Sequence, residues 1–402
     1  MTIFCFGQTE SNFYTIAKKH TIFSNILEEE REFYVHVPEG FWGMDMIMKQ
    51  YPVVFVLDGE SQFLNAVSAI DFLSSAPQGN DWMPRSIVVG IPNTNRTRDL
   101  TPTKANHWED PAVDELSGGG PKFLDFITKE LAPHIDSMYA TCNYRTIIGH
   151  SLGGLIVFEA LLEYRNFFTN YLAIDPALNY DGESYMNVLV DTLRRIDLSK
   201  EKVFVAKAQT VPTFYELNEL EMDEAKFVQT TRSNRRFLQL AESESWNIDL
   251  AIRDYFNENH FSAPYPAIYE GMKFFFDFYP FPEILDYYHP KYREKNNLVQ
   301  QMKKHYQSIS EQMGFEVIPM ESYIVSWAFG LSHFDRSDLA EVMYDYNIEL
   351  YPDHPSVYNT KARFMRSSGN QKEAIQLYEK SLLIKEDVEI RKLLEELQAK
   401  ID

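Results

Sequence analysis

The feature that most constrains this chain is the glycine-rich run from Gly149 to Gly154, which reads GHSLGG. It lies between two largely apolar segments, residues 144–148 and 155–158, so it predicts a strand, a tight turn and a helix in that order. A serine at the apex of such a turn has a strained backbone that only small neighbours permit, which accounts for the flanking glycines. The pattern therefore predicts a nucleophile elbow with Ser151 at its tip, as found in serine hydrolases.

A serine nucleophile needs a general base, and one of the ten histidines has a suitable setting. His260 follows an alternating, strand-like segment and a polar loop, and a helical pattern begins soon after it. In an α/β sheet, a histidine in the loop after the last strand faces the elbow. We therefore predict His260 as the base, and the alternative is a loop histidine with only local hydrogen bonds. His150 lies inside the elbow, where we expect it to serve packing or positioning.

The acidic partner of the histidine is less constrained by the sequence. A catalytic acid is expected after the strand that precedes the histidine's strand, and residues 202–208 have that strand's pattern. The stretch behind it is rich in acids, among which we rank Asp223 first, although it could equally cap the next helix. Asp175, after the apolar segment 171–174, is the alternative at the neighbouring strand end. A Ser-His dyad without a carboxylate also stays open. The other acids of the stretch are Glu216, Glu219, Glu221 and Glu224.

An acyl-transfer site also needs donors for an oxyanion. The amide of Leu152, at the start of the predicted helix, is the first candidate. The second is the amide of Gly59 or Glu60, which follow the buried-strand pattern 52–57. A polar loop, residues 92–102, should lie at the same edge and shape the pocket. Within it, Arg98 is a candidate anchor for an anionic substrate group, and a structural clamp between Arg98 and Asp99 is the alternative.

Together these residues resemble the Putative esterase family of α/β-hydrolases, and most closely its IroE-like siderophore esterase branch. The resemblance covers about residues 20–280. It implies an α/β-hydrolase sandwich with a central, mostly parallel sheet, and it matches the family's catalytic serine and histidine to Ser151 and His260. Some members of this branch resemble Ser-His dyads. The motifs that support the resemblance are Phe33 to Pro38, Val56 to Gly59, Arg98 to Pro102, Gly149 to Gly154, and His260 with its following helix.

Composition and charge limit the setting and the partners. The chain has 402 residues, 45% of them hydrophobic, and its length predicts two domains, residues 1–280 and 281–402. A net charge of −21 argues against nucleic acid and against an anionic membrane surface, and it should repel highly anionic substrates. Only Cys5 and Cys142 are present, so we expect no disulfide framework, no metal centre, no cofactor and a cytoplasmic setting.

Residues 281–402 contain an internal repeat of 34 residues. Ala328 is matched by Ala362, Ala340 by Ala374, and Tyr344 by Tyr378. The spacing predicts two tetratricopeptide-like repeats, residues 321–354 and 355–388, with a capping helix behind them. The alternative is a generic helical cap. Because two repeats seldom stand alone, this region should pack on the sheet domain, on a homodimer partner or on another protein.

Two classes of function follow from these patterns. The first is a serine hydrolase that cleaves small-molecule carboxylic esters through an acyl-enzyme on Ser151, with thioester hydrolysis or acyl transfer as variants. The second is an interaction protein that uses its repeats and has weak or no catalysis. The presence of both Ser151 and His260 favours the enzyme.

Overall fold

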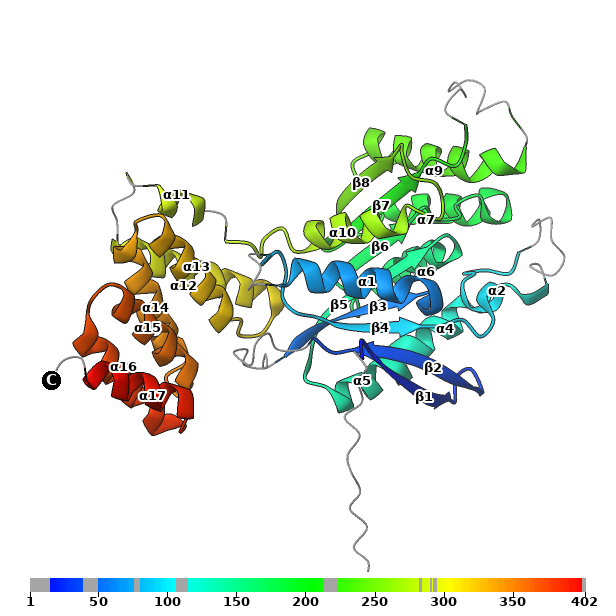
Figure 1. Ribbon diagram of the computed structural model, residues 1–402. Helices are drawn as coiled ribbons and strands as arrows, with labels where there is room; N and C mark the ends of the chain where they lie inside the picture. The colour runs from blue at the N-terminus through cyan, green and yellow to red at the C-terminus, as the bar shows by residue number, and fades with distance from the viewer. Residues whose placement is uncertain are drawn as a thin grey trace, which may run out of the picture.

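The structure is a computed structural model, and it describes residues 15–38, 50–75, 80–105, 115–212, 223, 225–281, 284–289, 291 and 295–399. Two parts are visible along the chain, a sheet body that ends at residue 281 and a helical extension that begins at residue 284 (Figure 1). The sheet body is a central β-sheet between layers of helices. Its α/β class is the one that the sequence predicts.

The central sheet has eight strands in the order β1-β2-β4-β3-β5-β6-β7-β8. The first two strands pair antiparallel with each other, and β2 pairs antiparallel with β4, whereas the other neighbours are parallel. The carboxyl ends of six parallel strands therefore share one edge, where loops can bring side chains together. The strands are β1 Lys18–Ser24, β2 Glu29–His36, β3 Tyr51–Leu57, β4 Ile87–Ile91, β5 Thr141–His150, β6 Asn170–Ile174, β7 Leu198–Ala208 and β8 Ile248–Tyr255.

Helices bury both faces of this sheet. Successive residues of a strand point to opposite faces, and in β3 Val54 and Val56 join one hydrophobic core while Val53 and Phe55 join the other. Helices α1 and α10 cover the first face, and the remaining helices of the sheet body cover the second. Burial on both sides explains why the central strands are continuous apolar runs. The helices are α1 Gly59–Leu73, α2 Arg96–Asp99, α4 Gly120–Phe126, the π-helix Ile127–Leu131, α5 Ala132–Met138, α6 Leu152–Glu163, the 3-10 helix Tyr180–Glu183, α7 Ser184–Leu193, α9 Lys226–Ser243 and α10 Pro264–Phe275.

The helical extension repeats at the spacing found in the sequence. Each boundary of the pair α15 and α16 lies 34 residues after the matching boundary of α13 and α14. Ala328, Ala340, Ala362 and Ala374 are fully buried, as close packing of the paired helices requires. That these pairs are tetratricopeptide repeats stays a prediction. The helices are α11 Ile284–Tyr288, α12 Lys295–Met313, α13 Glu321–His333, α14 Ser337–Leu350, α15 Pro355–Ser367, α16 Gln371–Ile384 and α17 Val388–Gln398. No helix in the described part of the chain is long and apolar enough to cross a membrane.

The helical extension packs on the sheet body, and the two share one hydrophobic core. Phe281 contacts Trp327 of α13 with ring centroids 5.4 Å apart, and His305 of α12 bonds the carbonyl of Tyr279 through Nε2 at 2.9 Å. Tyr306 of α12 also bonds Asp81, in the segment that precedes β4, so the extension packs at the end of the sheet opposite the elbow (Figure 1). Packing on the sheet body is one of the outcomes that the repeat predicts, and residue 280 stays a predicted domain boundary.

A buried carboxyl group lies at this seam. Asp81 is 7% exposed, and Tyr306 of α12 donates a hydrogen bond to its Oδ2 at 3.3 Å. Burial raises the pKa of Asp81 to about 7, against the smaller opposing effects of Tyr306, Arg85 and Tyr323. The seam is therefore most stable when this carboxyl group is protonated.

Asp81→Asn should change how the stability of the protein depends on pH. A carboxyl pKa raised by folding stabilises the folded state below its unfolded value of 3.8, and that contribution is lost as the pH rises through about 7. The variant imitates the protonated acid. At pH 8 it should therefore unfold at a higher temperature than the wild type, and its unfolding free energy should be larger by roughly 2–4 kcal/mol. At pH 5 the advantage should fall to about 1–2 kcal/mol, because only the part of the loss between pH 3.8 and 5 has then occurred. Thermal unfolding at both pH values measures this, and a difference that does not vary with pH would contradict it.

Candidate active site

The predicted elbow forms between β5 and α6. Ser151 separates the last residue of β5 from the first residue of α6, with φ 60° and ψ −117°. A backbone of this kind costs about 1–3 kcal/mol in a residue with a side chain. Position 149, two residues before Ser151, admits only glycine, because a Cβ on Gly149 would lie 2.2 Å from the carbonyl oxygen of Gly153. The amide of Ser151 donates to the carbonyl of Ile174 at 2.9 Å, which ties the elbow to the end of β6.

His260 lies in the turn between β8 and α10, and its partner is Asp175. Its Nδ1 is 2.6 Å from Oδ2 of Asp175, a carboxylate that is 1% exposed. The other oxygen of Asp175 accepts from the amide of Ala208 and from Nδ2 of Asn234, each at 3.0 Å. A carboxylate at Nδ1 favours the tautomer with its proton on that nitrogen, which leaves Nε2 free to accept a proton. The carboxylate is held by three donors and can orient the imidazole.

The structure therefore pairs His260 with Asp175, the alternative acid, and not with the first-ranked Asp223. Oδ1 of Asp223 accepts from the amide of Ala225 at 2.8 Å, just before α9 begins at Lys226. This bond closes a local turn just ahead of α9, whose N-cap residue is Ala225, so Asp223 lies two residues before the capping position that the sequence analysis gave as its other interpretation. The observed partner of the histidine follows β6, whereas the first-ranked acid follows β7, the next strand along the chain. The acids Glu216, Glu219, Glu221 and Glu224 lie outside the described residues.

Two further side chains contact the His260–Asp175 pair. Asn234, on α9, is 2% exposed and binds Asp175, and no sequence motif singles it out. A polar residue at a buried position of a helix is the one signal that could have found it. His150 packs against His260 with ring centroids 4.4 Å apart, as a packing role predicts. Burial, together with the nearby His260, lowers the pKa of His150 to about 4, so His150 is neutral at neutral pH.

The turn between β3 and α1 lies beside the elbow. A Cβ on Gly153 would be 3.5 Å from Oδ2 of Asp58, and a Cβ on Gly59 would be 2.6 Å from the amide nitrogen of Ile91. Glycine is therefore required where α1 begins. The predicted oxyanion donors, Leu152, Gly59 and Glu60, all belong to the first turns of α6 and α1, where amide hydrogens lack partners within the helix. Their role as donors stays a prediction.

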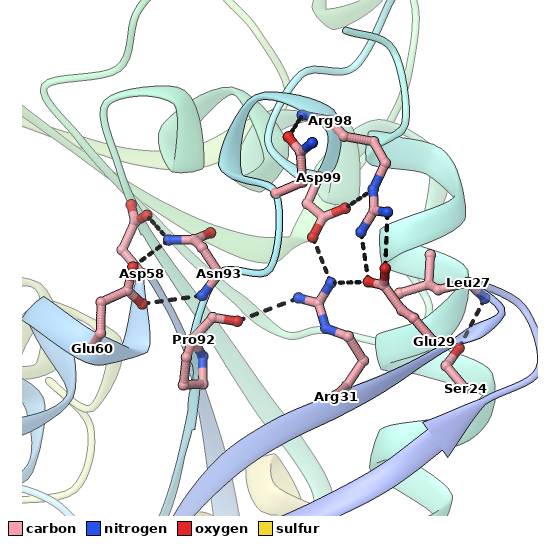
Figure 2. A network of polar contacts seen from close by, with 11 residues as sticks. Ser24, Leu27, Glu29, Arg31, Asp58, Glu60, Pro92, Asn93, Arg98 and Asp99 are labelled. Carbon is pink, nitrogen blue, oxygen red and sulfur yellow. Dashed lines mark hydrogen bonds and ion pairs between the residues drawn. The ribbon is translucent and has the colours of Figure 1, made fainter. Parts of the chain in front are cut away.

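Asp58 fixes this turn. Its carboxylate accepts from Asn93 Nδ2 at 2.6 Å and from Arg96 Nε at 2.7 Å (Figure 2 shows the Asn93 contact). Glu60 accepts from the amide and the side chain of the same asparagine, at 3.1 and 2.7 Å. Arg96 Nη2 also donates to the carbonyl of His150 at 3.3 Å. The loop 92–102 is thus bound to both turns of the site, in agreement with its predicted position.

Arg98 belongs to a separate cluster. Its guanidinium binds Asp99 at 2.7 Å and Glu29 at 2.6 Å, and the same two carboxylates bind the buried Arg31 (Figure 2). These contacts support the alternative interpretation, a structural clamp, which joins the loop to β2. Arg96, not Arg98, is the arginine of this loop that reaches the elbow. Within the residues that the structure describes, no group of three or more His, Cys, Asp or Glu side chains could hold a metal ion.

The family model "Putative esterase" matches residues 24–244, a range that contains Ser151 and Asp175 and ends before His260. The chain belongs to this family. Its relatives include the ferri-bacillibactin esterase BesA of Bacillus subtilis, 34% identical over 33% of this chain and 49% of the relative. Another is the siderophore triacetylfusarinine C esterase of Aspergillus fumigatus, 27% identical over 32% of this chain and 44% of the relative. The chain thus spans about half the length of the curated relatives that it matches.

Solved structures support the same fold. An IroE-like serine hydrolase from Shewanella oneidensis is 27% identical with a TM-score of 0.64, and the match covers 83% of this chain and 99% of that one. A protein from Capnocytophaga ochracea has 17% identity and a TM-score of 0.56, covering 95% of this chain and 99% of that one. The second likeness shows the fold alone, and its coverage reaches into the helical extension of this esterase-family chain.

The buried cluster at Arg98 generates a stability prediction for this esterase-family protein. Asp99 and Arg31 are 0% and 1% exposed, so Asp99→Asn leaves a buried guanidinium with less compensating charge. Breaking such a pair should lower the unfolding free energy by roughly 3 kcal/mol. Urea unfolding of the variant measures this. Glu32→Gln is the matched control, because the Lys19–Glu32 pair is half exposed and should contribute less than about 1 kcal/mol. Equal losses in both variants would contradict the prediction.

Proposed function

We propose that this protein hydrolyses small-molecule carboxylic esters through an acyl-enzyme on Ser151. The observation that supports it most directly is the 2.6 Å contact of His260 Nδ1 with Asp175, on the same sheet edge as the elbow. A histidine oriented in this way can serve first as base and then as acid. Membership of an esterase family points to the same reaction.

The proposed reaction has two halves. Oγ of Ser151 attacks the carbonyl carbon while Nε2 of His260 takes its proton, and the oxyanion forms near the amides of Leu152 and of Gly59 or Glu60. The C–O bond to the alcohol then breaks, and His260 returns the proton to the leaving oxygen. Water repeats the sequence on the acyl-enzyme and releases the acid. Asp175 holds the imidazole and stabilises its protonated form.

The substrate class is a further part of this proposal. BesA and the triacetylfusarinine C esterase act on siderophores by their names, so siderophore esters are among the compounds to test. The net charge of −21 should slow the approach of highly anionic ones, and this effect should weaken as salt is added.

Ser151→Ala should abolish covalent labelling by a fluorophosphonate, because only an activated serine reacts. Ester turnover should fall by about 10⁴-fold or more, and His260→Ala should cost nearly as much because the two act as one unit. Gel-based labelling and p-nitrophenyl ester hydrolysis measure both. Ser137→Ala, an exposed serine on α5, is the matched control and should label fully. Labelling that persists in Ser151→Ala would exclude this serine as the nucleophile.

Asp175→Asn should lower kcat by about 10²- to 10⁴-fold, since the imidazole loses the charge that orients it. Asp223→Asn should have little effect, because that carboxylate bonds the amide of Ala225 in a local turn ahead of α9 and not His260. Steady-state kinetics on both variants decide between the two acids, with thermal unfolding to show that each is folded. Full activity in Asp175→Asn would instead favour a Ser-His dyad.

A further inference from the structure

An exposed phenylalanine stands directly beside the histidine of the site. Phe261 is 85% exposed, and its ring meets the imidazole of His260 edge-on, with centroids 5.3 Å apart at 81°. Exposed apolar side chains are common singly, so exposure by itself is not informative. The neighbourhood of this one, however, sets it apart from a chance surface residue.

The turn that contains Phe261 is closed by its own hydrogen bonds. Oδ1 of Asn259 accepts from the amides of Phe261 and Ser262, at 2.9 and 3.1 Å. Oγ of Ser262 accepts in return from the amide of Asn259 at 3.0 Å, and the amide of Ala263 donates to the carbonyl of Asn259 at 3.0 Å. The backbone of Phe261 is therefore fixed, and its ring projects into solvent from a built turn.

Two further exposed apolar side chains lie on α1 and α10, near the edge of the site at which both helices begin. Helices α1 and α10 pack side by side and both begin at the edge of the site, so they run parallel. Ser68 Oγ is 3.4 Å from Tyr265 Oη, and the rings of Phe72 and Tyr269 are 6.3 Å apart. These two contacts between the helices are therefore four residues apart on each helix. One step back along α1 is Leu64, one turn nearer the edge of the site than Ser68, while Phe261 lies in the turn that leads into α10. Leu64 is 60% exposed and Tyr265 is 50% exposed.

Two charged side chains at this edge of the sheet, Arg96 and Lys207, are paired. Arg96 is bound to Asp58, and Lys207 is bound to Asp254 at 2.8 Å, with the exposed ring of Phe256 6.0 Å from its Nζ. Recognition at this side of the site therefore relies on apolar contact and ring stacking more than on ion pairs.

We propose that Phe261, Leu64 and Tyr265 form a specificity rim that binds an aromatic ring in the alcohol part of the ester. The inference rests on the proposed function. In that reaction, His260 gives its proton to the leaving oxygen, so the alcohol leaves alongside the imidazole and meets the residue next to it. Offset or edge-on stacking on Phe261 favours an aryl group over an aliphatic group of equal size.

Three acetates with the same acyl group test the rim: benzyl acetate, cyclohexylmethyl acetate and ethyl acetate. The wild type should prefer benzyl acetate in kcat/KM. Phe261→Ala should reduce the benzyl-to-ethyl ratio by about 3- to 10-fold, mainly through KM, because the lost contact binds ground state and transition state alike. Phe261→Leu should keep part of the preference over ethyl acetate but lose the preference over cyclohexylmethyl acetate. Phe329→Ala removes a ring that is 70% exposed from α13, in the helical extension, and should leave every ratio unchanged.

The outcomes separate the rim from the reaction itself. Equal losses on benzyl and ethyl acetate in Phe261→Ala would overturn the rim while the esterase proposal stands. The rim would also be overturned, with the esterase proposal intact, if the protein prefers an aromatic ring in the acyl group and not in the alcohol. The kcat/KM of ethyl phenylacetate compared with that of ethyl acetate measures this. A wild-type protein that neither hydrolyses these esters nor reacts with a fluorophosphonate would overturn the proposed function and the rim together.

Discussion

The site depends on one strained residue at the end of a central strand. Ser151 keeps a positive φ because β5 is paired on both sides and because its amide is bonded to the end of β6. The surrounding sheet, buried on both faces, supplies the stability that this conformation costs. The same edge places Asp175 directly after β6 and His260 after β8. The arrangement of the three side chains therefore follows from strand order, and the loops need only make short connections.

Charged side chains near the site are held by fixed partners. Three charged groups near the site have defined partners among the described residues: Asp175 has three donors, Asp58 has Asn93 and Arg96, and Lys207 has Asp254. His150, the second imidazole, is neutral because it is buried. Paired charges and a neutral imidazole leave few groups that could rearrange when a substrate arrives, which favours a preorganised site.

The sequence predicted the features whose signals are local. The elbow and the turn of His260 were visible because glycine spacing and strand alternation are properties of neighbouring residues, and the 34-residue repeat predicted the spacing of the helix pairs. The sequence ranked Asp223 first as the acid, because a rule about strand order favoured the acidic stretch after β7, whereas in the structure His260 contacts Asp175. Asp175 becomes the partner through tertiary contacts with Ala208 and Asn234, which lie 33 and 59 residues away. No pattern in one segment encodes such contacts.

The shared core of the sheet body and the helical extension has a consequence for synthesis. The last strand and His260 leave the ribosome before α12 and α13, which cover Tyr279 and Phe281. During that interval the nascent chain can complete its sheet while an apolar seam is still bare, and such surfaces promote aggregation of partly made chains. The seam lies at the end of the sheet away from the elbow, so the surface that is vulnerable during synthesis and the strained turn at Ser151 are on opposite sides of the molecule.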